Sequence, residues 1–246
     1  MAAAATASAQ FSLTTLSYSQ GFASLGSSAT ATLPDGWATT HLLSYNALTF
    51  ATTQAAGTTG PGAIGESSAG GIYNFGDGVT ASATDRALGF LSDSSYTMPR
   101  ALFFAFTNNT GASITSLTIN FDIEKYREGA RAFSLYFGTS PDLGSWATHL
   151  SASHSFAADG SNAGLSSPLT TAKTLTLTDL DITPGSSFYF RWLYTATTGT
   201  NSTNGQGLAI DNLSITAIPE PSTYAAIFGA LALAGVGVHR RRQARR

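Results

Sequence analysis

The 246-residue sequence contains no cysteine, only two methionines, and few charged residues, which make up 11% of the chain. Without cysteine it has no disulfide bonds, no thiolate metal ligands and no cysteine nucleophile. It also lacks the Gly-x-Ser-x-Gly, His-Glu-x-x-His and phosphate-loop patterns of serine hydrolases, zinc proteases and nucleotide-binding enzymes. A folded body must therefore be stabilised by its core alone, and 43% of the residues are apolar.

Positive charge is scarce before the C-terminus. Five of the 12 basic residues and one of the 14 acidic residues follow Ile218, so the preceding chain holds 7 basic and 13 acidic residues and a net charge of about −6. Nucleic acid needs a basic patch, so it is not an expected partner. No cofactor-binding pattern is present, and no cofactor is expected.

The chain before residue 218 has the pattern of eight to ten short β-strands. Leu117–Ile123 and Ser187–Tyr194 alternate apolar and polar side chains, as strands with one buried face do. Turns rich in Gly and Asn separate the strands, and no long helical period precedes Tyr224. These features predict one all-β domain over residues 10–217, an antiparallel β-sandwich of jelly-roll type.

Four local patterns give further predictions. Leu42–Phe50 alternates and is predicted as a strand, whereas Ala55–Gly71 has few large apolar side chains and is predicted as a loop. Glu124–Glu128 mixes charge signs, which favours paired charges at a sheet edge over an acid–base site. The alternation in Leu208–Ile215 changes phase at Asp211–Asn212, which predicts a β-bulge.

Residues 1–9 are interpreted as the remnant of a signal peptide. Ala7-Ser8-Ala9 has the small-x-small pattern of a signal-peptidase site, which would make Gln10 the new N-terminus. The alternative is a disordered alanine-rich terminus.

The C-terminal 29 residues, 218–246, carry the most specific signal. Tyr224–Val238 contains no charged residue, and as a helix it covers roughly 22 Å, short of the roughly 30 Å of a bilayer core. We predict a short transmembrane helix whose basic end stays in the cytoplasm and leaves the chain before Pro219 outside. The arginines that set this topology are Arg240, Arg241, Arg242, Arg245 and Arg246.

This tail resembles the PEP-CTERM sorting signal of Gram-negative and related bacteria. The motif Pro219-Glu220-Pro221, the short helix and the closing arginines occur in the order of that signal. The resemblance implies recognition by an exosortase, a membrane-embedded cysteine protease that removes the tail. It also implies association with the cell envelope or with extracellular polysaccharide. The same kind of tail is also known as the ice-binding protein C-terminal domain.

The body is similar to jelly-roll domains that precede such tails in environmental bacteria. In those domains the opening segment usually carries acidic residues in the pattern Gln-Asp-Phe-Asp. This chain has Gly21 and Ala23 at the acidic places. The matching segments are Tyr18–Phe22, Leu33–Trp37, Asp85–Gly89, Arg191-Trp192 and Gly207–Asn212.

Few residues are candidates for a ligand site. Trp146 lies in the loop-rich segment Pro141–Asn162, beside Asp142 and His149, and is the tryptophan proposed as a platform for sugar rings. Asp179 and Asp181 could bind Ca²⁺, but two carboxylates are few for such a site, and no metal site is assigned. Trp37 and Trp192 could also stack on sugar rings, but Trp192 lies in an aromatic strand and is expected in the core. His149 and His154 are expected to be surface histidines.

These observations predict an exported, exosortase-processed protein of the cell surface or extracellular matrix. It would be a carbohydrate-binding or structural module, and not an enzyme. The alternative is a protein that binds ice or another crystal surface, suggested by Thr174, Thr176 and Thr178 on one strand face. A weaker alternative is a glycan-active enzyme, which needs two carboxylates that face one cleft.

Overall fold

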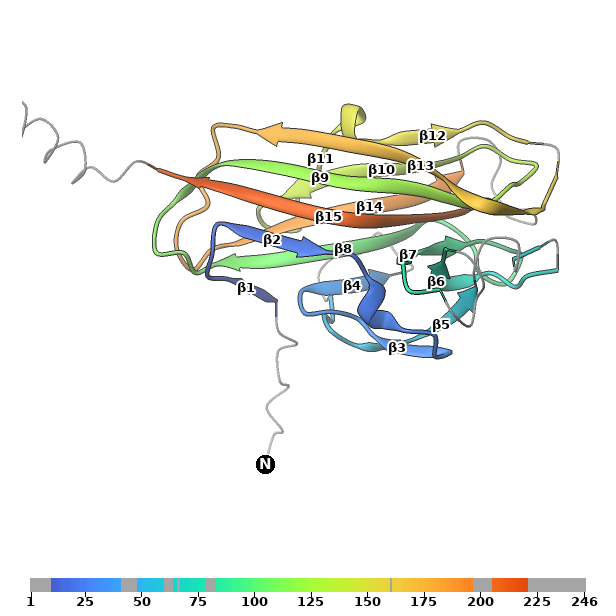
Figure 1. Cartoon of the computed structure of the whole chain (residues 1–246). Coiled ribbons are helices and arrows are strands. Elements are labelled where there is room, and N and C mark those ends of the chain that lie inside the picture. Colours follow the sequence, from blue (N-terminus) through green and yellow to red (C-terminus); the bar gives the residue numbers. More distant parts are fainter. Residues whose placement is uncertain are drawn as a thin grey trace, which may run out of the picture.

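The structure is a computed structural model that describes residues 10–40, 48–59, 64–65, 67–77, 83–159, 161–196 and 205–220. Within them the chain forms two β-sheets packed face to face (Figure 1) and two short 3-10 helices, η1 (Ala23–Leu25) and η2 (Leu150–Ala152). The expected all-β sandwich is confirmed. No described helix has the length and apolar character needed to cross a membrane. Residues 1–9, Pro221, the expected membrane helix Tyr224–Val238 and the arginines that follow it lie outside the described residues.

Sheet A has seven strands in the main order β1-β8-β14-β10-β11, with β4 beside β8 and β12 beside β10. Sheet B has eight strands in the order β13-β9-β15-β7-β6-β5-β3, with β2 beside β15. The strands of sheet A are β1 (Phe11–Leu13), β4 (Trp37–Thr40), β8 (Arg100–Asn108), β10 (Phe133–Ser140), β11 (Ala147–Thr148), β12 (His154–Phe156) and β14 (Ser187–Ala196). Those of sheet B are β2 (Ser17–Gln20), β3 (Thr30–Thr32), β5 (Thr53–Thr59), β6 (Gly71–Gly76), β7 (Arg86–Leu91), β9 (Ile114–Arg127), β13 (Gly164–Leu177) and β15 (Gly207–Pro219).

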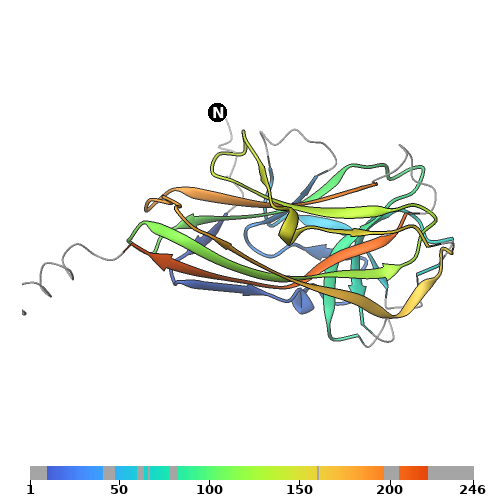
Figure 2. The ribbon, with the colours of Figure 1, turned by 90° about the horizontal axis from the view of Figure 1, so that it is seen from above.

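The long strands alternate between the sheets along the chain: β8, β10 and β14 belong to sheet A, and β9, β13 and β15 belong to sheet B. This crossing from one layer to the other gives the sandwich a jelly-roll-like topology. Seen from above, these strands run along the long axis of the molecule (Figure 2). Most pairs are antiparallel, as predicted, but β1 with β8 and β5 with β6 are parallel.

Aromatic side chains fill the space between the sheets. The four aromatic residues of β14 that were predicted to share one face all lie in the buried core. Trp37 stacks on Trp192 with their ring centroids 5.5 Å apart, and its Nε1 donates a hydrogen bond to the Tyr18 hydroxyl at 2.8 Å. Both tryptophans are 0% exposed, which confirms the core assignment of Trp192 and shows that Trp37 is a core residue as well.

One segment that was predicted as a loop contains a strand. β5 covers the first part of Ala55–Gly71 and pairs with both β3 and β6. The Tyr73 ring of the neighbouring strand β6 fills the space beside β5, which leaves room only for small side chains there. A Cβ added to Gly57 would lie 2.7 Å from this ring. β5 therefore lacks the alternation of apolar and polar residues by which a strand is predicted from sequence.

The charged stretch Glu124–Glu128 does not lie at a sheet edge, because β9 is an interior strand between β13 and β15. The prediction of paired charges is confirmed for Lys125, which forms an ion pair, whereas Glu124 and Arg127 form hydrogen bonds with neutral groups. Lys125 forms an ion pair with Asp159, and Arg127 Nε donates to the Gly65 carbonyl at 3.0 Å. Buried charges require such partners, so the pairing follows from the interior position.

The predicted bulge at Asp211–Asn212 is confirmed. The register between β15 and β9 shifts between Asp211 and Ser214, and Asn212 has a φ of 50°. Of the predicted strand Leu42–Phe50, only residues 48–50 are described, and they are not in a strand.

Candidate functional site

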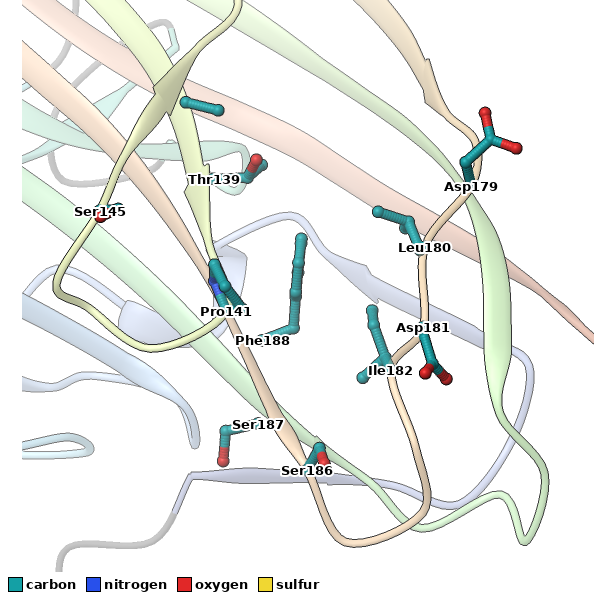
Figure 3. A pocket seen from close by; sticks show the side chains of 11 residues that line it. Thr139, Pro141, Ser145, Asp179, Leu180, Asp181, Ile182, Ser186, Ser187 and Phe188 are labelled. Carbon is teal, nitrogen blue, oxygen red and sulfur yellow. The ribbon is translucent and has the colours of Figure 1, made fainter.

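A crevice of about 520 Å³ opens where β10 ends and β14 begins (Figure 3). One wall is the turn between β10 and β11, and the other is the connection from β13 to β14. We call this cavity the end crevice. Its lining residues are Thr139, Pro141, Ser145, Ala147, Asp179, Leu180, Asp181, Ile182, Ser186, Ser187 and Phe188.

The wall between β13 and β14 is fixed to both sheets. Ile182 forms an antiparallel bridge with Ile114 of β9 in sheet B. Asn108 of β8 in sheet A is 0% exposed and donates from Nδ2 to the Ile182 carbonyl at 2.6 Å. The amide of Gly185 donates to the Asn108 carbonyl at 2.7 Å. The crevice therefore has a preformed wall.

The crevice combines apolar and polar lining residues. Phe188 and Ile182 are only 6% and 4% exposed, and the Leu180 side chain reaches from its wall toward the opposite side (Figure 3). Among the hydroxyl groups, Thr139 Oγ1 lies 2.9 Å from Nε2 of His149. An apolar lining with a few placed polar groups is typical of a site for a small organic ligand.

Asp179 and Asp181 lie on the same wall, and their carboxylates point away from the side toward which Leu180 reaches (Figure 3). They are therefore not placed on two sides of a bound sugar, as the acid and base of a glycosidase are. Within the described part of the chain, no three His, Asp or Glu side chains are grouped to hold a metal ion.

Trp146 lies beside the end crevice, between the lining residues Ser145 and Ala147. Its ring is half-buried and meets Phe103 edge to face, with centroids 5.7 Å apart. The Arg191 guanidinium covers the ring at 4.5 Å from its centroid. Trp146 thus packs on the outer surface of sheet A and does not form the floor of the crevice.

The other two candidates in this segment hold the wall in shape. The Asp142 carboxylate accepts a hydrogen bond from the Gly144 amide at 2.9 Å, and such backbone donors hold the pKa of Asp142 below its usual value. The His149 ring forms a hydrogen bond with the Thr139 hydroxyl, and burial lowers the pKa of this ring. His154 lies on β12 against Phe156, away from the lining residues.

The expected sorting motif Pro219-Glu220-Pro221 begins at the end of the sandwich. Pro219 is the last residue of β15, and the exposed Glu220 donates its backbone N–H to the Ser113 carbonyl at 2.8 Å. The motif therefore follows directly from an interior strand of sheet B.

Asp211 is a buried carboxyl group that the sequence singled out only as part of a bulge. It is 1% exposed, and its Oδ1 has no hydrogen-bond partner among the described groups. Burial, with the negative charges of Glu124 and other nearby carboxylates, raises the pKa of Asp211 to about 8. Gly21 lies close to this carboxyl group, because a Cβ added to Gly21 would lie 3.9 Å from the oxygen.

No family model matches the chain, and no curated protein matches it. Among solved structures, it is similar to the K3 cleaved adhesin domain of Lys-gingipain from Porphyromonas gingivalis, at 10% identity and a TM-score of 0.43, over 81% of this chain and 98% of that one. The CBM22-1 xylan-binding domain from Paenibacillus barcinonensis gives 8% identity and a TM-score of 0.36, over 83% and 95%. The enzymatically active domain of tailspike protein 4 from bacteriophage CBA120 gives 8% and 0.37, over 81% of this chain but only 21% of that one. At these values the comparisons carry no conclusion about function.

Proposed function

We propose that this chain is an exported surface or matrix protein that binds polysaccharide in the end crevice. The observation that carries the proposal is the crevice itself: about 520 Å³, with a buried apolar part, hydroxyl groups and a fixed wall. Sugars present both C–H faces and hydroxyl groups, so a mixed lining of this kind complements them. The acidic body disfavours nucleic acid and anionic lipid as ligands.

The turn between β10 and β11 is the part of the predicted loop Pro141–Asn162 that contributes to this site. The other predicted loop, Ala55–Gly71, contributes none of its described residues to the crevice. Trp146 would act mainly by holding the turn against Phe103 and Arg191, with its exposed edge available to a bound chain. Each contact is weak, so useful affinity would come from many copies on one surface.

The proposal can be tested by a substitution that places a large side chain in the crevice. Ala147 is exposed and lines the crevice, so Ala147→Trp should block the site without disturbing the core. In gel electrophoresis through immobilised neutral and acidic polysaccharides, we expect at least one to retard the wild-type chain and Ala147→Trp to migrate freely. Ala172→Trp, at an exposed position of β13, is the matched control and should be retarded like the wild type. Equal retardation of both variants would refute the site, and no retardation of the wild type by any polysaccharide would refute the function.

We also propose that an exosortase cuts this protein near Pro219-Glu220-Pro221 after the C-terminal helix has anchored it in the membrane. The support is the order of motif, apolar run and arginines in the sequence. Proline lacks an amide donor and disfavours helix, so the two prolines would keep the cleavage segment extended. Mass spectrometry of the mature protein from a host with an exosortase should find a C-terminus near residues 218–222. Intact protein ending at Arg246 would contradict this proposal, as would unchanged processing of the double variant Pro219→Ala, Glu220→Ala.

A further inference from the structure

One end of the outer face of sheet B carries a regular array of short polar side chains. Four neighbouring strands, β13, β9, β15 and β2, contribute to it, and they lie side by side in Figure 1. The strand register places the residues in two rows, which we call the hydroxyl grid. The first row is Thr176, Thr118, Thr216 and Ser17, and the second is Thr174, Asn120, Ser214 and Ser19.

The sheet sets the spacing of the hydroxyl grid. Neighbouring strands lie about 4.8 Å apart, and residues two positions apart on one strand lie roughly 6.7 Å apart. Five of the eight residues are exposed and three are half-buried. The three threonines of the first row are β-branched and stiff at χ1, so their hydroxyl and methyl groups are held in place.

The second row is linked by hydrogen bonds across the strands. Thr174 Oγ1 donates to Asn120 Oδ1 at 2.8 Å, and Asn120 Nδ2 donates to Ser214 Oγ at 3.3 Å. Asn120 is thus held from both sides. The grid is therefore fixed before any ligand arrives.

The composition of the grid limits its partner. It contains no charged and no aromatic side chain, so it offers nothing to an anionic polymer or lipid headgroup and no ring for sugar stacking. A protein partner needs an apolar centre with aromatic or arginine anchors. Two exposed large apolar residues lie at one end of the grid: Ile218, 52% exposed, follows Thr216, and Leu16, 42% exposed, precedes Ser17. They lie at the margin of the grid and give it no apolar centre.

We propose that the hydroxyl grid binds the surface of ice, a function distinct from polysaccharide binding in the end crevice. An ice surface is neutral and presents donors and acceptors in a repeating lattice. Hydroxyl groups both donate and accept, so they can match either kind of water. Single hydrogen bonds are weak, but rigid groups at fixed spacing engage the lattice together.

The test measures how the full chain partitions between slowly growing polycrystalline ice and the remaining liquid. The wild-type chain should be enriched in the ice several-fold over a passive protein such as serum albumin. Thr216→Lys places a long charged side chain in the first row and should lower this enrichment to the passive level. The matched control is Thr30→Lys, at an exposed position on β3 at the far edge of sheet B, and it should behave like the wild type.

Circular dichroism and thermal melting show whether each variant is folded, and Ser17→Lys on β2 replaces Thr216→Lys if the latter does not fold. Passive exclusion of the wild type from ice overturns the proposal, and so does undiminished enrichment of the grid variants. Binding to crystalline cellulose that is lost in Thr216→Lys, without ice binding, would assign the grid to a glycan instead. Ala147→Trp should leave ice enrichment unchanged, which separates this proposal from that for the end crevice.

Discussion

Asp211→Asn should stabilise the protein at neutral pH. Burial raises the pKa of Asp211 in the folded state to about 8, from an ordinary value near 3.8 in the unfolded chain. Between these values the unfolded chain loses this proton while the folded chain keeps it, so folding stability falls as the pH rises from about 4 to about 8. Each unit of pKa difference corresponds to about 1.4 kcal/mol, so the loss of stability at pH 7 is on the order of a few kcal/mol once solvent screening is allowed for.

Asparagine has nearly the same shape and no charge, so it should remove this cost. The expected result is a higher midpoint of thermal unfolding at pH 7 to 8, a gain that shrinks toward zero near pH 4. Asp181→Asn removes the same charge at an exposed position and should change the midpoint little. A midpoint for Asp211→Asn equal to or below that of the wild type at pH 8 would show that the folded protein tolerates the ionised carboxylate.

Gly89→Ala should have the largest destabilising effect of any glycine-to-alanine change in the described strands. Gly89 of β7 lies opposite Ala209 of β15, and a Cβ at this position would lie 2.0 Å from the Leu208 carbonyl oxygen. The atoms it would meet are main-chain atoms, which cannot move aside without separating the two strands. Overpacking of this kind costs about 3 kcal/mol or more.

For a chain of this length, that cost lowers the melting temperature by roughly 6–12 °C, which differential scanning calorimetry measures directly. Gly65→Ala is the matched control, because a Cβ there has no atom within 4 Å and no positive φ is recorded. An unchanged melting temperature for Gly89→Ala would mean that β7 and β15 are farther apart than the structure shows.

Strands that bury their own apolar side chains could be predicted from the sequence. The alternation of Leu117–Ile123 and of Ser187–Tyr194 requires one buried face, and both segments lie in strands of the sandwich core. The bulge at Asp211 was predicted for the same reason, since a change of phase in the alternation has to be accommodated by the backbone. β5 was missed because the Tyr73 ring of its neighbour fills the space above Gly57.

The candidate sites depend on pairing between distant segments, which no local pattern contains. The end crevice joins the turn after Ser140 to the connection before Ser187, and the strands β12 and β13 separate them in the chain. The hydroxyl grid was visible only as Thr174, Thr176 and Thr178 on one strand. The register with β9, β15 and β2 turns Thr174 and Thr176 into part of a two-dimensional array. Trp146 was proposed from the sequence as a platform for sugar rings, but its packing against Phe103 and Arg191 could not be inferred from sequence spacing.

The most direct test of the proposed function is hydrogen–deuterium exchange of the full chain with and without a polysaccharide that retards it. Binding in the end crevice should slow exchange in residues 139–147 and 179–188, which form its walls. Exchange in the exposed edge strand β3, far from the crevice, should not change. Protection confined to other segments, with residues 139–147 and 179–188 unaffected, would contradict the assignment of polysaccharide binding to the end crevice.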